Sequence, residues 1–307
     1  MIKNEKILIT GVTGAIALPV ARMLAMDNEV WGIARFTNEA ARQELKEAGI
    51  QTVPLDLTSD DLAALPEDFS LVLHYAYTRM ASGQFHEAIE LNAIAAGRVL
   101  KHCRNARAAL VLSAATLYSR NEDPNHRYVE TDDIGLVAAP WAASSPVSKV
   151  TLEAVARFSA EAFGLPVTIA RPACPYGTGF DVVTTVIDSV VAGQPVYVTN
   201  DPQPYTVIHI DDMCRQVGDL LSAAAVPAKI VNWGSDEVVT MQEIAKRTGE
   251  VLGVEPEFAM IPAPNVALGG VLDTTLLNSI AAPCEVSFHD AFEEICRARV
   301  SASSAAK

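Results

Sequence analysis

The stretch Lys6-Ile7-Leu8-Ile9-Thr10-Gly11-Val12-Thr13-Gly14-Ala15-Ile16-Ala17 decides the fold of this chain. Its apolar first half is rich in β-forming residues and predicts a strand, and the apolar spacing from Leu18 to Leu24 predicts a helix. The glycines between them expose backbone N–H groups at the positive end of that helix, where a pyrophosphate binds. The stretch therefore predicts a strand, a phosphate-binding loop and a helix.

Four residues of the loop form the expected phosphate cradle, namely Gly11, Thr13, Gly14 and Ile16. A Cβ atom at Gly11 or Gly14 would obstruct the approach of a phosphate to the backbone. Ala17 stands where a third glycine is frequent, so we expect the helix to pack closely on the strand with one extra methyl group between them.

Strands and helices alternate along the first half of the chain. Apolar runs predict strands at 29–34, 51–57, 71–76, 109–113 and 167–172, and helical patterns cover 38–47, 85–103 and 148–163. This alternation predicts an α/β fold with a doubly wound parallel sheet of the Rossmann type over residues 1–172, with further sheet contributions from about 206–235.

Proline and glycine become frequent beyond Pro172, and the regular alternation loosens. Residues 173–298 are therefore expected to form mainly a smaller, C-terminal substrate-binding lobe. Residues 299–307 are rich in small and polar side chains and are expected to be a flexible tail.

The composition narrows the classes of function. Lys plus Arg number 23 against 37 Asp plus Glu, a net charge of −14, which opposes binding to nucleic acid or to an anionic membrane surface. No apolar run is long enough to span a bilayer and no signal-peptide pattern precedes the first strand, so a cytoplasmic location is expected. The five cysteines lack metal-ligand spacing, which predicts reduced thiols and no metal site.

Two polar residues follow the second and third predicted strands. Arg35 stands where a dinucleotide-binding unit usually carries an acid for the ribose 2′-hydroxyl, and a guanidinium there suits a 2′-phosphate instead. Asp56 is expected to accept from the adenine amino group, unless it only begins a turn. The residues thus favour NADP as cofactor, with NAD as the alternative.

The chain resembles the extended short-chain dehydrogenase/reductase family, the NAD-dependent epimerase/dehydratase group, over nearly its whole length. Its motifs include Thr10-Gly11-Val12-Thr13-Gly14, Asp56-Leu57, His74-Tyr75-Ala76, Asn92, Ser113-Ala114-Ala115-Thr116-Leu117-Tyr118, Arg171-Pro172, Tyr176-Gly177, His209-Ile210-Asp211-Asp212 and Val231-Asn232-Trp233-Gly234-Ser235.

The resemblance implies a Rossmann fold, a bound nicotinamide cofactor and a homodimer formed through two helices that flank the sheet. It also implies that further residues line the cofactor site. These are Leu57, Ala76, Asn92, Lys149 and Pro172.

The sequence departs from the family at the proton-handling positions. The family's chemistry uses a tyrosine four residues before a lysine on one helix, and here the lysine is Lys149 and the tyrosine position is Ser145. The family's catalytic Ser or Thr falls on Ala114. A serine hydroxyl is far less acidic than a phenol, so Ser145 with Lys149 does not form the same proton relay near neutral pH.

Other side chains are candidates for the missing role. Ser113 is next to the lost hydroxyl but is expected to point to the opposite face of its strand, and Thr116 and Tyr118 lie in the loop after it. For Tyr118 we favour a structural role over a catalytic one. Cys174 is either a pocket nucleophile or, more commonly for such a residue, an inert buried thiol.

Two histidines are expected to be structural. His74 is expected to satisfy a hydrogen bond of a turn, and His209 is expected to contact the start of the helix at Asp211-Asp212. Neither has a partner at metal-ligand spacing.

The sequence therefore favours an atypical NAD(P)-dependent oxidoreductase, epimerase or lyase that acts on a small molecule. The alternative is a non-catalytic NADP-binding sensor or partner protein that keeps the nucleotide site without the proton relay. The lobe carries few basic anchors, among them Lys229, Lys246 and Arg247, which favours a substrate less anionic than a sugar-nucleotide diphosphate.

Overall fold

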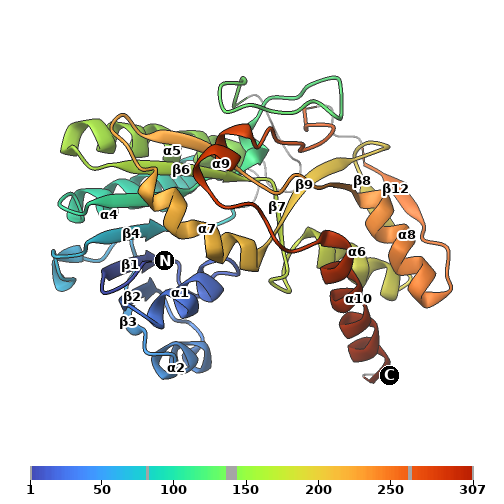
Figure 1. Cartoon of the computed structure of the whole chain (residues 1–307), viewed down its shortest axis with the longest axis horizontal. Coiled ribbons are helices and arrows are strands. Elements are labelled where there is room, and N and C mark those ends of the chain that lie inside the picture. The colour runs from blue at the N-terminus through green and yellow to red at the C-terminus, as the bar shows by residue number, and fades with distance from the viewer. Residues whose placement is uncertain (1, 81–82, 136–143, 262–264, 306–307) are drawn as a thin grey trace.

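The computed structural model of the protein describes residues 2–80, 83–135, 144–261 and 265–305. Figure 1 shows a larger unit built on a central sheet near the N-terminus and a smaller lobe beside it that contains α6, α8 and α10.

Seven parallel strands form the central sheet in the order β10-β6-β5-β4-β1-β2-β3. Their bounds are β1 Lys6–Thr10, β2 Glu29–Ala34, β3 Gln51–Pro54, β4 Leu71–His74, β5 Ala108–Leu112, β6 Val167–Pro172 and β10 Lys229–Trp233. The strand order reverses between β1 and β4, which opens a crevice outside the carboxyl ends of these strands. The predicted doubly wound sheet is confirmed, and β10 is its contribution from the 206–235 region.

Alternating side chains of β1 pack against helices on opposite faces of the sheet. Ile7 and Ile9 share a core with one set of helices, and Leu8 belongs to the core on the other face. The first set comprises α1 Ala17–Ala25, α2 Glu39–Glu47 and α7 Ile210–Ser222, and the second α4 Ala95–His102 and α5 Ser144–Phe163.

The helix predicted over 85–103 is interrupted by a π-helical turn. It consists of α3 Phe85–Ile89, the π-turn η2 Glu90–Ile94 and then α4. Helix α5 begins at Ser144, one turn before the predicted start, and β3 ends at Pro54 rather than residue 57. Short 3₁₀ turns η1 Leu62–Ala64 and η3 Ala115–Leu117 follow β3 and β5.

The smaller lobe has two small sheets and three helices. The sheets are β7 Cys174–Tyr176, β9 Pro204–His209 and β11 Val238–Thr240, and β8 Val196–Val198 with β12 Phe258–Met260; the helices are α6 Val182–Val191, α8 Met241–Leu252 and α10 Phe288–Ala305. Its core joins Ile187, Ile244 and Phe292 from the three helices.

The chain returns from the lobe to the larger unit twice. Between β9 and β11 it forms α7 and β10, and after β12 it forms α9 Thr275–Ile280, which packs near β10. The last segment, where we expected a tail, continues α10 as far as Ala305. Among the described residues, no helix is both long and apolar enough to cross a membrane.

Candidate active site

The loop between β1 and α1 is fastened to the end of β4. Gly11 has a φ of +66°, and a Cβ atom placed on it would lie 2.6 Å from the Cα atom of Ala76. The backbone N–H of Ala76 donates to Oγ1 of Thr10 over 3.1 Å. The close approach of Ala76 therefore requires a glycine at position 11. This requirement adds to the one expected from the sequence, which is the approach of a phosphate to the backbone.

The N-terminus of α1 fits a phosphate group. Its first turn carries no acidic residue and its N-cap, Ile16, makes no side-chain cap. Thr13 and Gly14 are exposed, and a Cβ atom on Gly14 would approach the Gly11 carbonyl oxygen to 3.0 Å. An uncapped helix start with a bare backbone before it favours a bound anion, so these residues fit the pyrophosphate of a dinucleotide.

Arg35 and Asp56 lie at the next two strand ends. Arg35 is exposed after β2, and its charge contributes to the low pKa of Asp56. The larger cause is that Thr58 donates to Asp56 Oδ1 from its hydroxyl, over 2.6 Å, and from its backbone N–H, over 2.9 Å. Leu57, which follows, is half-buried against the core of the α4 face.

Lys149 on α5 reaches the end of β5. Its Nζ donates to the carbonyl oxygen of Leu112 over 2.8 Å, and the residue is 5 % exposed. Burial lowers the pKa of Lys149 to about 7, although the charge of Glu153 acts in the opposite direction. Pro172 ends the neighbouring strand β6 and is also buried.

Ser145 lies one turn before Lys149 and is half-buried. Its hydroxyl accepts a hydrogen bond of 2.6 Å from the phenol of Tyr77. The Nζ atom of Lys149 lies 4.2 Å from the centroid of the Tyr77 ring. The lysine and two hydroxyls thus form one cluster, which the sequence predicted only in part.

A buried polar network lies behind this cluster. Arg171 forms a bidentate ion pair with Glu153, with N···O distances of 2.8 and 2.7 Å. Ser113 donates to the same carboxylate over 2.6 Å. Arg171 also donates to the Tyr118 hydroxyl over 2.9 Å, and that hydroxyl donates to Asn232 over 2.6 Å.

This network engages two of the candidate catalytic hydroxyls. Tyr118 is 1 % exposed and Ser113 is 3 % exposed, and both hydroxyls point at buried partners. Burial raises the pKa of Tyr118 to about 12, against the lowering effect of Arg171. The geometry supports the structural interpretation of Tyr118 and extends it to Ser113.

The two remaining candidates lie in opposite surroundings. Thr116 is exposed in η3. Cys174 is buried in the core of the lobe, and burial raises its pKa to about 12, which opposes a role as a nucleophile.

The two histidines have structural partners. His74 Nδ1 lies 3.0 Å from the Thr10 hydroxyl, and burial, with the charge of Lys149, lowers the pKa of His74 to about 3. His209 is the N-cap of α7 and accepts from the backbone N–H of Asp211 over 3.2 Å.

Asn92 holds the segment after β4 rather than pointing toward the glycine loop. Its side-chain oxygen accepts from the Thr78 N–H over 2.7 Å, and its nitrogen donates to the Thr78 carbonyl over 3.0 Å and to that of Ala88 over 2.9 Å. Any contribution to cofactor binding is therefore indirect, through the Ala76–Thr78 segment.

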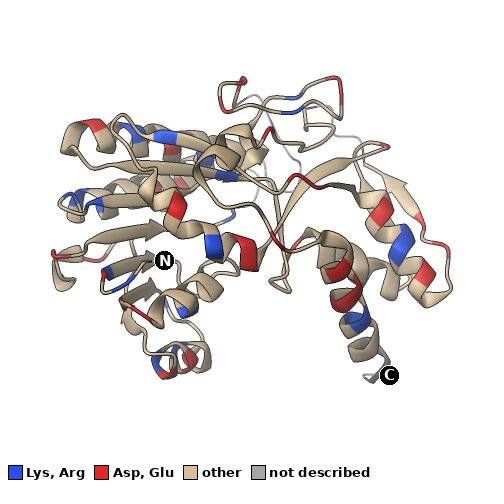
Figure 2. Cartoon of the chain, viewed as in Figure 1, with Lys and Arg blue, Asp and Glu red and all other residues tan. Residues whose placement is uncertain are grey.

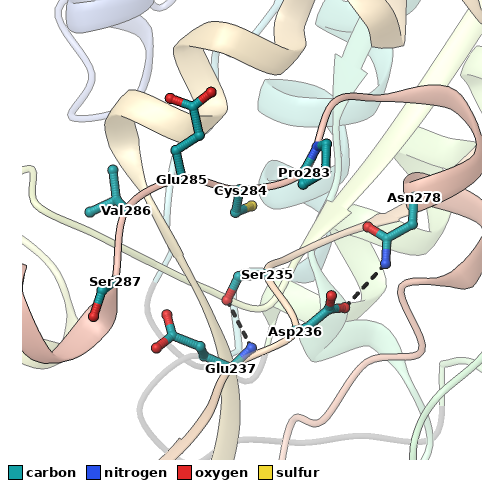
Figure 3. A pocket seen from close by; sticks show the side chains of 9 residues that line it. All are labelled: Ser235, Asp236, Glu237, Asn278, Pro283, Cys284, Glu285, Val286 and Ser287. Atoms are coloured by element: carbon teal, nitrogen blue, oxygen red, sulfur yellow. Dashed lines mark hydrogen bonds between the residues drawn. The ribbon is translucent and has the colours of Figure 1, made fainter.

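Two cavities lie near the lobe and are acidic. Figure 3 shows the first, of about 240 Å³, in which the Asn278 side chain donates to Asp236 and the backbone N–H of Glu237 donates to the Ser235 hydroxyl. The second, of about 590 Å³, is lined in part by Asp211, Glu285 and Asp290, and Figure 2 shows the acidic residues of α10. Neither is lined by Gly11, Ser145 or Lys149, and the described residues contain no group of three potential metal ligands.

The strand order, the glycine loop and the buried lysine define a dinucleotide-binding α/β enzyme. Residues 7–234 match the model of the NAD dependent epimerase/dehydratase family, and the chain belongs to this family. The resemblance found in the motifs is confirmed, as is the expectation of a nicotinamide-dependent enzyme. A search of curated proteins gave no match.

Solved structures share the fold along almost the whole chain. UDP-glucuronic acid 4-epimerase from Bacillus cereus, in complex with UDP-glucuronic acid and NAD, has a TM-score of 0.81 at 18% identity, covering 95% of this chain and 98% of its own. UDP-N-acetylglucosamine 4-epimerase from Methanobrevibacter ruminantium M1 has a TM-score of 0.79 at 18% identity, with coverages of 98% and 100%.

A dehydratase has the same architecture. The dTDP-glucose 4,6-dehydratase DesIV from Streptomyces venezuelae, solved with NAD, has a TM-score of 0.78 at 19% identity, covering 95% of this chain and 96% of its own. At these identities the similarity establishes the fold alone.

Proposed function

We propose that the protein is an NAD(P)-dependent oxidoreductase or epimerase that acts on a carbonyl or secondary-alcohol group of a small molecule. One observation carries the proposal: the phosphate cradle and Lys149 lie at the ends of two adjacent strands of the sheet. Gly11 packs on Ala76 directly after β4, and Lys149 reaches Leu112 at the end of the adjacent strand β5. A dinucleotide that lies across this edge extends from the α1 N-terminus toward the lysine.

Each group of residues has a defined task in this proposal. Gly11, Thr13, Gly14 and Ile16 hold the pyrophosphate, and Lys149 donates to a ribose hydroxyl at the nicotinamide end. Ala76 and Pro172 line the crevice between the two ends, and Asp56 and Leu57 lie at the adenine end. When bound, the cofactor supplies or accepts the hydride.

The substrate is proposed to carry less negative charge than a nucleotide sugar. Two of the similar structures are 4-epimerases of UDP-sugars, and those substrates belong to those proteins. In this chain, residues 173–298 carry few basic anchors for a diphosphate, among them Lys229, Lys246 and Arg247. A cytoplasmic location and a homodimer, both expected from the sequence, are part of the same proposal.

Cofactor preference is a separate prediction. We propose NADP over NAD because the exposed guanidinium of Arg35 follows β2, where the adenosine ribose lies in this fold. In an Arg35→Ala variant, NADPH should bind roughly 10-fold more weakly, as expected for a lost charge-assisted phosphate contact, while NADH binding is unchanged. Fluorescence titration of the two cofactors measures this, with Arg22→Ala on α1 as the control. Equal weakening of both cofactors would remove the argument for a 2′-phosphate.

Turnover tests the proposed reaction. Purified protein is titrated with NADPH and NADH and then assayed against a panel of aldehydes, ketones and secondary alcohols. Binding together with cofactor-dependent turnover supports the proposal. Binding without turnover would favour the non-catalytic sensor, and substrate cleavage without any change in cofactor absorbance would favour the lyase.

A further inference from the structure

We propose that the hydroxyl of Tyr77 is the proton donor and acceptor of the reaction, in place of the tyrosine that is missing from α5. This inference rests on the proposed function and names the catalytic residue of the same site. It follows from a contact between two segments that lie far apart in the sequence.

The Tyr77 hydroxyl ends at the position of the missing residue. Its Oη atom lies 2.6 Å from Oγ of Ser145, the residue four positions before Lys149. Tyr77 is half-buried, so its ring is fixed while part of the side chain stays accessible. A phenol therefore reaches this part of the crevice from the segment after β4 instead of from α5.

Lys149 is placed to assist proton transfer. Its Nζ atom lies 4.2 Å from the centroid of the Tyr77 ring, within the range of a cation–π contact. A positive charge at this position stabilises the negative charge that develops on the phenol oxygen as the proton leaves. The donation from Lys149 to the Leu112 carbonyl, over 2.8 Å, fixes the ammonium there.

The backbone on both sides of Tyr77 is held in place. Before it, Ala76 packs against Gly11 of the phosphate loop. After it, Asn92 hydrogen-bonds both the N–H and the carbonyl of Thr78. Tyr77 is thereby positioned beside the cofactor cradle before any substrate binds, which is the condition for efficient proton transfer.

The four other side chains considered from the sequence as candidates are less suited to the role. Ser113 and Tyr118 are engaged in the buried network around Arg171. Cys174 is 3 % exposed within the lobe core. Thr116 is exposed, and an aliphatic hydroxyl is a much weaker acid than a phenol.

In the proposed reaction, one proton moves through Tyr77 for each hydride that is transferred. In reduction, the carbonyl carbon of the substrate receives a hydride, and with it two electrons, from the reduced dinucleotide. Tyr77 Oη gives its proton to the carbonyl oxygen, so that an alcohol forms and a phenolate remains. The phenolate then recovers a proton from solvent through the Ser145 hydroxyl. In oxidation of an alcohol, every step runs in reverse.

The test compares Tyr77→Phe with a matched variant, Tyr75→Phe. The Tyr75 hydroxyl is buried in the core on the α1 face and has no hydrogen-bond partner among the described residues. With the panel substrate that the wild-type protein turns over best, Tyr77→Phe should lower kcat by about 10²- to 10⁴-fold, the usual contribution of general acid–base catalysis. The dissociation constants for NADPH and NADH should not change, and Tyr75→Phe should retain wild-type kcat.

An exchange variant provides a second measurement. Tyr77→Ser combined with Ser145→Tyr moves the phenol to α5, and it should recover part of the kcat that Tyr77→Phe loses. An exchange variant as inactive as Tyr77→Phe would count against the inference. Wild-type kcat in Tyr77→Phe would overturn the inference alone, whereas a wild-type protein without turnover would overturn the proposed function and the inference together.

Discussion

Lys149 is almost fully buried, and this gives the stability of the protein a pH dependence that an exposed lysine does not produce. Burial lowers its pKa from 10.5 to about 7. Between these values the unfolded chain carries a proton that the folded chain has released, so the free energy of unfolding rises with pH across this window. The groups that face its ammonium are Tyr77, His74, Glu153 and the Leu112 carbonyl.

A Lys149→Met variant should lose this dependence. Its free energy of unfolding, measured in urea between pH 7 and 10, should fall relative to wild type as the pH rises, by at most about 1.4 kcal/mol per pH unit for one proton. Other titrating groups are common to both proteins and cancel in the difference. Lys246→Met on the exposed face of α8 is the control and should show the wild-type slope. Parallel slopes for Lys149→Met and wild type would show that the lysine is not buried in the folded state.

At the residue scale, sequence reasoning succeeded where function depends on local spacing. The glycine loop and the replacement of tyrosine by Ser145 are visible in short patterns. The Tyr77–Ser145 contact was missed because it joins segments that no pattern connects. The network that contains Ser113 and Tyr118 was missed because burial of a hydroxyl depends on what the fold brings around it.

At the element scale, the π-turn η2 is the feature that a periodicity of 3.6 residues cannot reveal. The stretch 85–103 reads as one helix, yet Glu90–Ile94 form i→i+5 turns that widen it locally. Asn92 lies in this turn and bonds the backbone of Thr78. The turn thus connects a flanking helix to the segment that carries Tyr77.

An Asn92→Ala variant should loosen that segment. Loss of the amide leaves the Thr78 N–H and carbonyl without their partner, which should lower the free energy of unfolding by about 1 to 3 kcal/mol. Amide hydrogen exchange in the segment Tyr77–Met80 should accelerate by more than the lower free energy of unfolding alone would produce. Thr248→Val, a buried change on α8, is the control for destabilisation alone. If both variants left exchange at Tyr77–Met80 equally protected, Asn92 would have no positioning role.

At the scale of the whole molecule, the two units are interleaved. The alternation of apolar runs predicted the positions along the chain of the first six strands of the sheet, but not their order within it. It did not predict that α7 and β10 pack on and extend the sheet of the larger unit. Local periodicity does not encode which strand pairs at the edge of a sheet. The described α7 packs on one face of β5 and β6, and β10 pairs with β6 at the edge.

A fragment of residues 1–172 should therefore fail to fold as an independent unit. It lacks α7 and β10, so the face of β5 and β6 that packs on α7 and the edge of β6 would both contact water. We expect no cooperative urea transition and no binding of NADPH, in contrast to the full chain. A cooperative transition of this fragment would show that residues 1–172 form a domain by themselves.

The pairing of β6 with β10 also has a consequence during synthesis. Every residue of β6 is buried in the finished protein, but its second partner, β10, follows only after residues 173–228 have been made. At the usual rate of translation, this delay is roughly 3 to 11 s. For that time a strand that is buried along its whole length in the finished protein has one open edge on the ribosome, which exposes it to pairing with another chain until β10 is made.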